Sequence, residues 1–237
     1  MTETTAAPAW TRLGTMLLDL LFPPRCVGCQ RMGNWLCAAC LEAVGRVRGP
    51  VCPHCGRPFR DSGLCPDCAG GSFALQQVRA PLFFEGTIQR AVHALKYRGR
   101  HVLAGPLGRL LANTLGELDW PAATIVPVPL HRLRERARGY NQSALLARPV
   151  AAQVGWPLQE SGLIRERNTP PQVGLDRPAR QENVRGAFRW TAPAPPPARV
   201  LLLDDVYTTG ATMEACAQAL RQAGATEVRG LALARPR

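Results

Sequence analysis

The chain has 237 residues and a net charge of +12, from 29 basic and 17 acidic residues. Because 46% of its residues are hydrophobic and no apolar run approaches the ~20 residues of a membrane span, the composition predicts a soluble globular protein of one or two domains. The positive charge favours phosphorylated or nucleic-acid ligands. All the basic residues except Lys96 are arginine, so this lysine either marks a need for a compact charge or survives by chance.

Residues 1–24 form the first predicted unit, a short amphipathic helix that ends at Pro23-Pro24. The segment is not typical of a secretory signal, because Glu3 precedes every basic residue and Asp19 interrupts the apolar patch. The apolar face is expected to pack against the body of the protein, and contact with a membrane surface is the alternative. That face consists of Leu13, Met16, Leu17, Leu20 and Leu21.

Eight of the nine cysteines lie within residues 25–71, in four Cys-x-x-Cys pairs. A gap of two residues lets both thiolates of a pair reach one metal ion, and two pairs complete a tetrahedral zinc site. A disulfide framework would need an oxidising compartment, which the absence of an export signal argues against. The sequence therefore predicts a double zinc ribbon with two structural Zn²⁺ ions. The predicted ligands are Cys26, Cys29, Cys37, Cys40, Cys52, Cys55, Cys65 and Cys68.

The spacing allows two arrangements of the four cysteine pairs. Sequential pairing gives one ion bound by the cysteines of residues 26–40 and another bound by those of residues 52–68. Cross-bracing, in which the first pair joins the third, is the alternative. Few large apolar residues lie between the pairs, so metal binding should supply most of the folding energy. Removal of the metal should then unfold residues 26–68 while sparing the rest of the chain.

Residues 72–237 alternate between strand-like and helix-like patterns, which is typical of an α/β fold with a parallel sheet and helices on both faces. Lys96 falls in the last turn of the first of these helices, before Gly99 as the expected stop. Strands are predicted over 78–84, 124–128, 156–159, 200–203 and 227–233, and helices over 88–96, 103–115, 141–154 and 210–223.

An arginine-rich segment over residues 131–139 follows the predicted strand 124–128 and contains a single acid, Glu135. A solvated run of charge is the usual explanation for such a cluster. Here the run follows the carboxyl end of a strand, on the same edge of the sheet as Asp204, so anion binding is favoured. The cluster consists of Arg132, Arg134, Arg136 and Arg138.

The segment 200–212 carries the most specific chemical signal. Four aliphatic residues predict a strand buried on both faces, and Asp204 and Asp205 lie at its carboxyl end. The next residues lead into a helix whose N-terminus offers backbone N–H groups to a phosphate. Carboxylates beside such a cradle indicate a phosphorylated ligand with vicinal hydroxyls or Mg²⁺, and a purely structural turn is the alternative. The cradle consists of Tyr207, Thr208, Thr209, Gly210, Ala211 and Thr212.

This segment resembles the phosphoribosyl pyrophosphate (PRPP) motif of type I phosphoribosyltransferases over its whole length. The resemblance implies that Asp204 and Asp205 are the catalytic acids, which hold the ribose hydroxyls or Mg²⁺, and that the cradle holds the 5-phosphate. It makes Lys96, Arg136 and Arg138 candidates for binding the pyrophosphate. Residues 161–197 show little periodicity and are then predicted to form a lid loop that shields the transition state from water.

Two further stretches narrow the resemblance, Lys96-Tyr97-Arg98-Gly99 and Arg138-Gly139-Tyr140-Asn141-Gln142. Together with the cysteine block, they make the chain from about Cys26 to its end similar to the ComF family, the ComFC-type late competence proteins. The lid also fits that family in the order of Thr169, Gln172, Leu175, Arg180, Asn183 and Phe188.

The resemblance to the ComF family implies a double zinc ribbon joined to a type I phosphoribosyltransferase-like domain over residues 72–237. It implies a role in natural transformation on the cytoplasmic side of the membrane. There the protein would handle incoming single-stranded DNA, with a competence helicase as a partner.

The sequence indicates where a phosphoribosyl group would bind, but it has no recognisable pocket for an acceptor. An adaptor that grips PRPP, or phosphoribosyl groups on DNA, is therefore the leading interpretation. An active Mg²⁺-dependent phosphoribosyltransferase with an unidentified acceptor is the alternative. Such an enzyme would act mostly by positioning its substrates and stabilising charge.

Overall fold

The computed structural model describes residues 23–170 and 177–237. The helix predicted near the N-terminus falls on residues 1–22 and lies outside the described residues, as do Gln172 and Leu175 of the lid. No helix in the described part of the chain is both long and apolar enough to cross a membrane.

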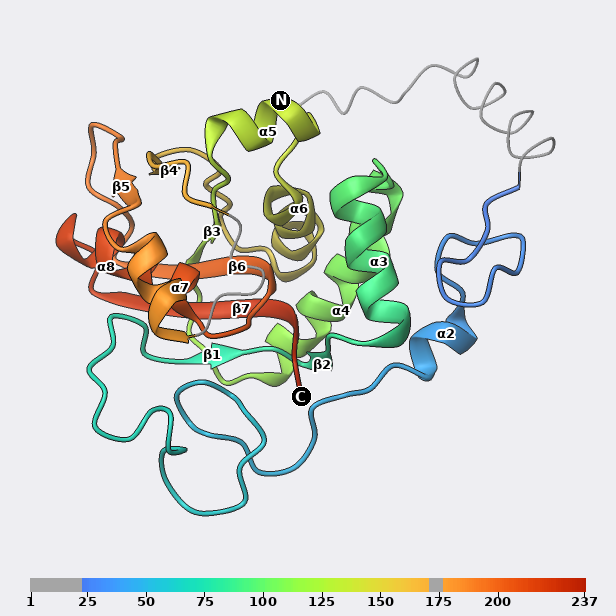
Figure 1. Ribbon diagram of the computed structural model, residues 1–237, viewed down its shortest axis with the longest axis horizontal. Helices are drawn as coiled ribbons and strands as arrows, with labels where there is room; N and C mark the ends of the chain where they lie inside the picture. Colours follow the sequence, from blue (N-terminus) through green and yellow to red (C-terminus); the bar gives the residue numbers. More distant parts are fainter. Residues whose placement is uncertain (1–22, 171–176) are drawn as a thin grey trace.

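A parallel sheet forms the centre of the molecule (Figure 1). Its strands run in the order β1-β7-β6-β3, and β2 also pairs with β7. The central strand β6 lies between β3 and β7, with Leu203 opposite Pro127 and Asp204 opposite Ala232. These pairings confirm the predicted parallel α/β sheet. The strands are β1 (Val78–Arg79), β2 (Leu82–Phe83), β3 (Thr124–Pro127), β6 (Arg199–Val206) and β7 (Glu227–Arg235).

Helices cover both faces of this sheet, and successive residues of β6 face different apolar cores. Leu201 and Leu203 pack with helices α3, α4 and α6, whereas Val200 and Leu202 pack with helix α8. This alternation follows from the pleat of a strand, and it buries β6 on both sides as predicted. The helices are α3 (Gly86–Tyr97), α4 (Ala104–Glu117), α6 (Gln142–Val154) and α8 (Ala211–Gln222).

Two predicted strands differ from the structure, and one helix, over residues 132–138, was not predicted. The strand predicted over 78–84 is divided into β1 and β2 by Pro81, which has no N–H to donate to the ladder. The strand predicted over 156–159 is reduced to one parallel bridge between Leu158 and Ile125. Helix α5 (Arg132–Arg138) forms without a buried residue, so no apolar periodicity could predict it. A short 3₁₀ helix, η1 (His101–Leu103), precedes α4.

The predicted lid segment contains more regular structure than its lack of periodicity suggests. Strands β4 (Leu163–Arg165) and β5 (Phe188–Trp190) form an antiparallel pair, and helix α7 (Arg177–Val184) lies between them in the chain. Leu163, Val184 and Phe188 pack into the same core as α8. The segment is therefore anchored on the α8 side of the sheet.

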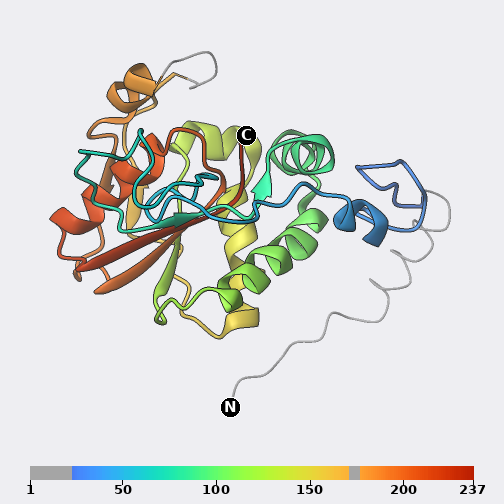
Figure 2. The ribbon, with the colours of Figure 1, turned by 90° about the horizontal axis from the view of Figure 1, so that it is seen from below.

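The two cysteine clusters lie on different parts of the molecule, as the two views in Figures 1 and 2 show. The first includes Cys40 of helix α2 (Ala38–Glu42) and lies beside α3, where Arg90 donates hydrogen bonds to the carbonyls of Val27 (3.0 Å) and Gly28 (3.1 Å). The second lies against the core on the α8 side of the sheet.

Candidate functional site

The acidic pair lies near the carboxyl end of β6, where only 9% of Asp204 and 2% of Asp205 is exposed. The first turn of α6 provides polar contacts to both carboxylates. Ser143 Oγ donates to Asp204 Oδ1 at 2.8 Å, and Gln142 Nε2 lies 3.5 Å from Asp205 Oδ1. The backbone N–H of Asp205 donates to Asp204 Oδ1 at 2.9 Å. Two adjacent carboxylates are thus held inside the protein by the start of one helix.

Lys96, in the last turn of α3, forms an ion pair with Asp205 through Nζ and Oδ2. Burial opposes ionisation of both groups. The nearby charge of Asp205 nevertheless raises the pKa of Lys96, and the charge and hydrogen bond of Lys96 lower the pKa of Asp205. Both members of the pair are therefore charged. The only lysine of the chain is placed against an acid, which fits a need for a compact cation.

Asp204 is in a different electrostatic state from its neighbour. Burial, followed by the negative charge of Asp205, raises the pKa of Asp204 to about 7, although Lys96 and Ser143 partly oppose the shift. A hydroxyl donor or a cation would stabilise the ionised form of this carboxylate. The pair thus offers oxygen atoms of the kind that ribose hydroxyls and Mg²⁺ prefer, so its chemistry fits the predicted ligand.

The predicted phosphate cradle forms the turn between β6 and α8. Gly210 has a φ of 84° and caps the helix, and a Cβ at this position would lie 2.4 Å from Tyr207 Oη. Thr209 Oγ1 accepts a hydrogen bond of 3.4 Å from Ala211 N, and Thr212 follows in the first turn of α8. The chain therefore turns tightly enough to place Thr208–Gly210 at the N-terminus of a helix of 12 residues.

A cavity of about 280 Å³ opens beside this turn. Residues Tyr207 to Ala211 line it together with His54 and Arg57 of the second cysteine segment and Arg235 of β7. Arg235 is 3% exposed, and its Nη1 donates to Cys55 O at 2.8 Å. No residue of the cysteine block was predicted to lie next to the cradle, because the contact between Arg235 and Cys55 joins residues 180 positions apart in the chain.

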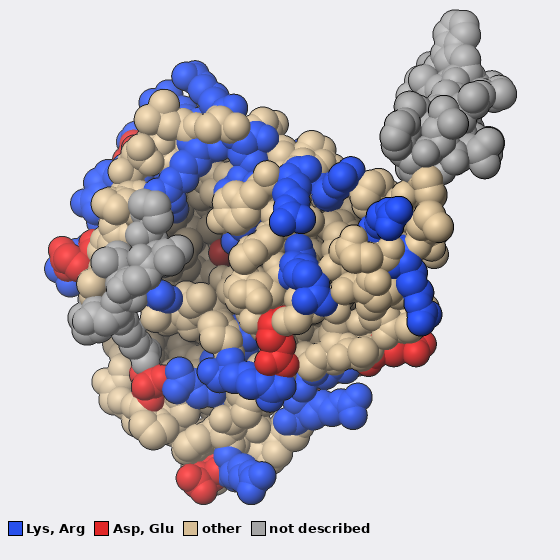
Figure 3. Space-filling model, turned by 45° about the vertical axis from the view of Figure 1, so that its right-hand side comes forward, with Lys and Arg blue, Asp and Glu red and all other residues tan. Residues whose placement is uncertain are grey.

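A second, basic cavity of about 370 Å³ is lined by Lys96, Tyr97, Arg134, Arg138 and Tyr140, among others. Arg138 Nη1 donates to Gln142 Oε1, and its guanidinium lies 5.5 Å from the centre of the Tyr97 ring. Arg134 Nη2 donates to the carbonyl of Thr169 in the lid segment. Figure 3 shows Lys and Arg side chains around a hollow on one face of the molecule.

The structure divides the arginine cluster of 132–138 into two groups. Arg134 and Arg138 are half-buried in the basic cavity, whereas Arg132 and Arg136 are exposed on α5. Arg136 does not line this cavity, although it was predicted to share a ligand with Lys96 and Arg138. A helix with a period of about 3.6 residues places positions 134 and 138 on one face, and positions 132 and 136 on another.

Ser143 and Gln142 are functional candidates that sequence reasoning missed. The helix predicted over 141–154 is present as α6, and Asn141 caps it: Asn141 Oδ1 accepts from Ser143 N at 2.9 Å. A residue at the start of a helix beside the ligand-binding edge of a parallel sheet can reach the carboxylates on the next strand. The position of Gln142 and Ser143 at the start of such a helix was the signal from which their role could have been predicted.

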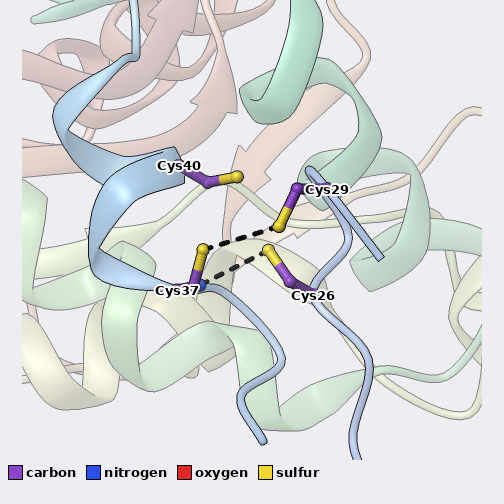
Figure 4. Close-up of side chains that lie close together, drawn as sticks. All are labelled: Cys26, Cys29, Cys37 and Cys40. Atoms are coloured by element: carbon purple, nitrogen blue, oxygen red, sulfur yellow. Dashed lines mark hydrogen bonds between the residues drawn. The ribbon is translucent and has the colours of Figure 1, made fainter. Parts of the chain in front are cut away.

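Eight cysteines form two separate clusters, and in each the four Sγ atoms lie within 4.8 Å of one another. The grouping is sequential, not cross-braced: Cys26, Cys29, Cys37 and Cys40 form one, and Cys52, Cys55, Cys65 and Cys68 form the other. Figure 4 shows the four side chains of the first cluster converging. Both clusters are consistent with a structural zinc ion.

The two clusters repeat one backbone design. Cys37 N is directed at Cys26 Sγ, and Cys65 N at Cys52 Sγ, both at 3.4 Å. Burial opposes ionisation of Cys26 and Cys52, but backbone N–H groups lower the pKa of both thiols to about 6. Each cluster therefore contains a cysteine prepared to be a thiolate, the form that binds zinc.

The surroundings of the two clusters differ. All four cysteines of the second cluster are buried and belong to the apolar core beneath α8, whereas Cys29 is exposed and Cys37 and Cys40 are half-buried. Glu214 of α8 also binds the segment that follows the second cluster, because its carboxylate accepts a hydrogen bond of 2.7 Å from Ala74 N. The second half of the cysteine module is thus part of the main core.

The comparisons with known proteins agree with these clusters and with the family resemblance. A family model described as a double zinc ribbon domain matches residues 17–69. The chain is 33% identical over 227 residues to the DNA utilization protein YhgH of Salmonella typhimurium. The aligned region covers 91% of this chain and 99% of that protein. The chain belongs to the ComF/YhgH family.

Two relatives in this family are named for competence. The chain is 29% identical to competence protein F of Haemophilus influenzae, over 89% of this chain and 96% of that protein. It is 27% identical to competence protein ComFC of Bacillus subtilis, over 80% of this chain and 79% of that protein. Among solved structures, the glutamine PRPP amidotransferase of B. subtilis is 26% identical over 56% of this chain and 26% of that chain, with a TM-score of 0.38.

The equivalent cysteines of the two clusters provide a test of their different roles. Cys37→Ser and Cys65→Ser should each reduce the zinc content from two ions to one. Cys65→Ser should also cost about 2–5 kcal/mol of stability, since it disrupts the core beneath α8. Thermal unfolding would register roughly 2–4 °C for each kcal/mol lost. A larger loss of stability for Cys37→Ser, or fewer than two zinc ions in the unaltered protein by elemental analysis, would contradict this assignment.

The turn at Gly210 allows a second test. Gly210→Ala should destabilise the protein by more than Gly155→Ala, which has a similar φ of 71° but nothing within 4 Å of its Cβ. In the control variant, only the cost of placing alanine in the left-handed conformation lowers the stability, by about 1–2 kcal/mol. Gly210→Ala must also move the buried Tyr207 ring, which should add about 1–3 kcal/mol. Equal losses in denaturant unfolding would show that the turn is not held by Tyr207.

Proposed function

We propose that this protein binds a phosphoribosyl ligand at the carboxyl end of β6 and handles single-stranded DNA along the neighbouring arginines. The observation that carries the proposal is the buried acidic pair, Asp204 and Asp205, directly before a tight turn into a helix N-terminus. The names of its relatives, DNA utilization and competence proteins, support a role in the uptake or use of DNA.

The acidic pair and the cradle have distinct roles in this proposal. Asp204 accepts hydrogen bonds from ribose hydroxyls, and with Asp205 it supplies oxygen ligands for a Mg²⁺ ion that accompanies PRPP. The backbone N–H groups and hydroxyls of residues 207–212 hold the 5-phosphate at the start of α8. Asp205 is already neutralised by Lys96, so Asp204 is the carboxylate with more to gain from the ligand.

The basic cavity suits the pyrophosphate end of the same ligand. Lys96 lies in both places, since it lines this cavity and pairs with Asp205. Arg138 and Arg134 supply guanidinium groups that can bind phosphate oxygens in a bidentate manner. Arg136, exposed on α5, is better placed for DNA than for pyrophosphate. The lid segment contributes the carbonyl of Thr169, which holds Arg134 in position.

The proposal favours binding without catalysis. The site has groups suited to a phosphoribosyl ligand, but no pocket for an acceptor is recognisable in the described part of the chain. An active, Mg²⁺-dependent phosphoribosyltransferase is the second candidate, favoured by the cavity for a leaving pyrophosphate. Release of pyrophosphate from PRPP with a panel of nucleobases and amines would establish the enzyme. Binding of PRPP without release would support the adaptor.

DNA binding in this proposal depends mainly on phosphate contacts. The chain has a net charge of +12 but only 6% aromatic residues, and the exposed Arg132 and Arg136 lie on α5 beside the basic cavity. We also propose a cytoplasmic location at the inner face of the membrane and a competence helicase as the partner that delivers or receives the strand. The family resemblance is the support for both.

Asp204→Asn should weaken the binding of PRPP with Mg²⁺ at least about tenfold, or about 1.4 kcal/mol, because the ribose hydroxyls lose a charged acceptor. Isothermal calorimetry would measure the affinity, and Asp61→Asn, at an exposed position of the second cysteine segment, is the matched control. Asp205→Asn is a poorer choice, because it leaves Lys96 buried without its partner. An Asp204→Asn protein that folds and binds PRPP normally would place the ligand elsewhere.

The two groups of arginines should separate DNA binding from ligand binding. The double variant of Arg132→Gln and Arg136→Gln should lower the salt dependence of single-stranded DNA binding by about 1.4, or roughly 0.7 for each lost phosphate contact. PRPP affinity should not change. The double variant of Arg134→Gln and Arg138→Gln should weaken PRPP binding instead. Anisotropy titrations at several salt concentrations, with calorimetry, would decide, and the reverse pattern would refute this division.

A further inference from the structure

A third cavity, of about 290 Å³, lies between the first cysteine cluster and α3. Its size is near the lower end of the range of roughly 300–1,000 Å³ for ligand pockets. None of the described residues that line it is acidic. Arg25, Val27, Gln30 and Trp35 line it from the cysteine segment, and Arg90, His93, Ala94, Arg98 and Arg100 line it from α3 and the turn that follows.

No ion pair within residues 23–170 and 177–237 neutralises the charge in this cavity. Among the described residues, none of Arg25, Arg90, Arg98 and Arg100 forms an ion pair. Arg90 is held by the carbonyls of Val27 and Gly28, which leaves its positive charge in place. Four guanidinium groups around one concave surface favour an anionic ligand with several charges, because each guanidinium is permanently charged.

The cavity also has a stacking surface. The guanidinium of Arg100 lies 4.4 Å from the centre of the Trp35 ring. Nucleic-acid bases stack on aromatic rings and on arginine planes, and their faces are free to do so only in a single strand. Trp35 is half-buried inside the cavity, so it is poorly placed to insert into a lipid bilayer.

One short segment joins this cavity to the basic cavity at Lys96. Lys96, Tyr97 and Gly99 line the basic cavity, whereas Arg98 and Arg100 line the cavity at Trp35. His93 lines the Trp35 cavity, and its ring centre lies 5.9 Å from that of Tyr97 in an edge-to-face arrangement. The guanidinium of Arg138 lies over the same Tyr97 ring. The two cavities therefore open on either side of the end of α3.

We propose that the Trp35 cavity is a binding site for single-stranded DNA. A base stacks against the Trp35–Arg100 pair, and the flanking phosphates contact Arg25 and Arg98. The strand then passes around the end of α3 towards Lys96. This inference rests on the proposed function, since it assigns a second part of the surface to the strand held by α5. It gives the first cysteine cluster a role in DNA binding through the position of Trp35.

The direct test is the double variant of Arg98→Gln and Arg100→Gln, in the full-length protein loaded with zinc. Binding of a fluorescent oligo(dT) should weaken at least about tenfold at 0.1 M salt, and the salt dependence should fall by about 1.4. The matched control is Arg48→Gln with Arg60→Gln, which removes the same charge from two exposed positions of the cysteine segments. Equal binding by the test and control variants would overturn the proposal.

Substitutions of Trp35 test the stacking contact separately. Trp35→Leu should weaken oligo(dT) binding by about 5- to 100-fold, the size of one base–aromatic stack, and Trp35→Phe should restore most of the affinity. Zinc content and circular dichroism would show whether each variant folds, and the arginine variant decides if Trp35→Leu does not. Normal oligo(dT) binding by a folded Trp35→Leu protein would overturn the stacking role.

The outcomes also separate this site from the proposed function. PRPP affinity should be unchanged in the Arg98 and Arg100 variant. If the unaltered protein binds PRPP but no oligo(dT), the DNA part of the proposed function fails, and this site fails with it. If the variant loses binding to phosphatidylserine vesicles but keeps oligo(dT) binding, the cavity recognises lipid phosphates, and the DNA assignment is wrong.

Discussion

The buried ion pair between Lys96 and Asp205 joins helix α3 to the central strand of the sheet. A carboxylate in the interior is costly unless a partner compensates for its lost hydration, and two adjacent carboxylates repel each other as well. Lys96 meets this requirement for Asp205, and Ser143 does so in part for Asp204. The end of α3 and the start of α6 therefore both contact the acids at the end of β6.

Each cysteine cluster supports one side of this arrangement. The first cluster contacts α3 through Arg90, and α3 carries Lys96. The second cluster contacts the α8 side through Arg235 and Glu214, next to the turn that forms the phosphate cradle. Zinc in these clusters would stabilise the two halves of the ligand site from opposite faces of the sheet. The cysteine residues are therefore connected to the ligand chemistry through packing, not through the reacting atoms.

Much of the fold could be predicted from the sequence because its signals are local. The aliphatic run before Asp204 predicts a buried strand, Asn141 predicts a helix start, and Cys-x-x-Cys spacing predicts two groups of four converging cysteines; the structure contains all three. The family model and the relatives of the chain confirm the double zinc ribbon and the family that the motifs indicated.

What could not be predicted depends on contacts between distant segments. Arg235 meets Cys55 across 180 residues, and no pattern near either residue indicates the other. The burial of the second cluster under α8 has the same cause, since few apolar residues surround its cysteines in the chain. Helix α5 was missed because it buries nothing, and Pro81 divides a strand whose apolar pattern is continuous. Packing between distant segments, not local propensity, decided the first two of these features.

In the proposed function, one ligand spans the acidic pair and the cradle. A crystal structure of the protein with PRPP and Mg²⁺ would show whether it does. We expect the 5-phosphate at the N-terminus of α8, against residues 208–212, and the ribose hydroxyls within hydrogen-bonding distance of Asp204. PRPP bound only among Lys96, Arg134 and Arg138, with Asp204 and the cradle free of ligand, would contradict it.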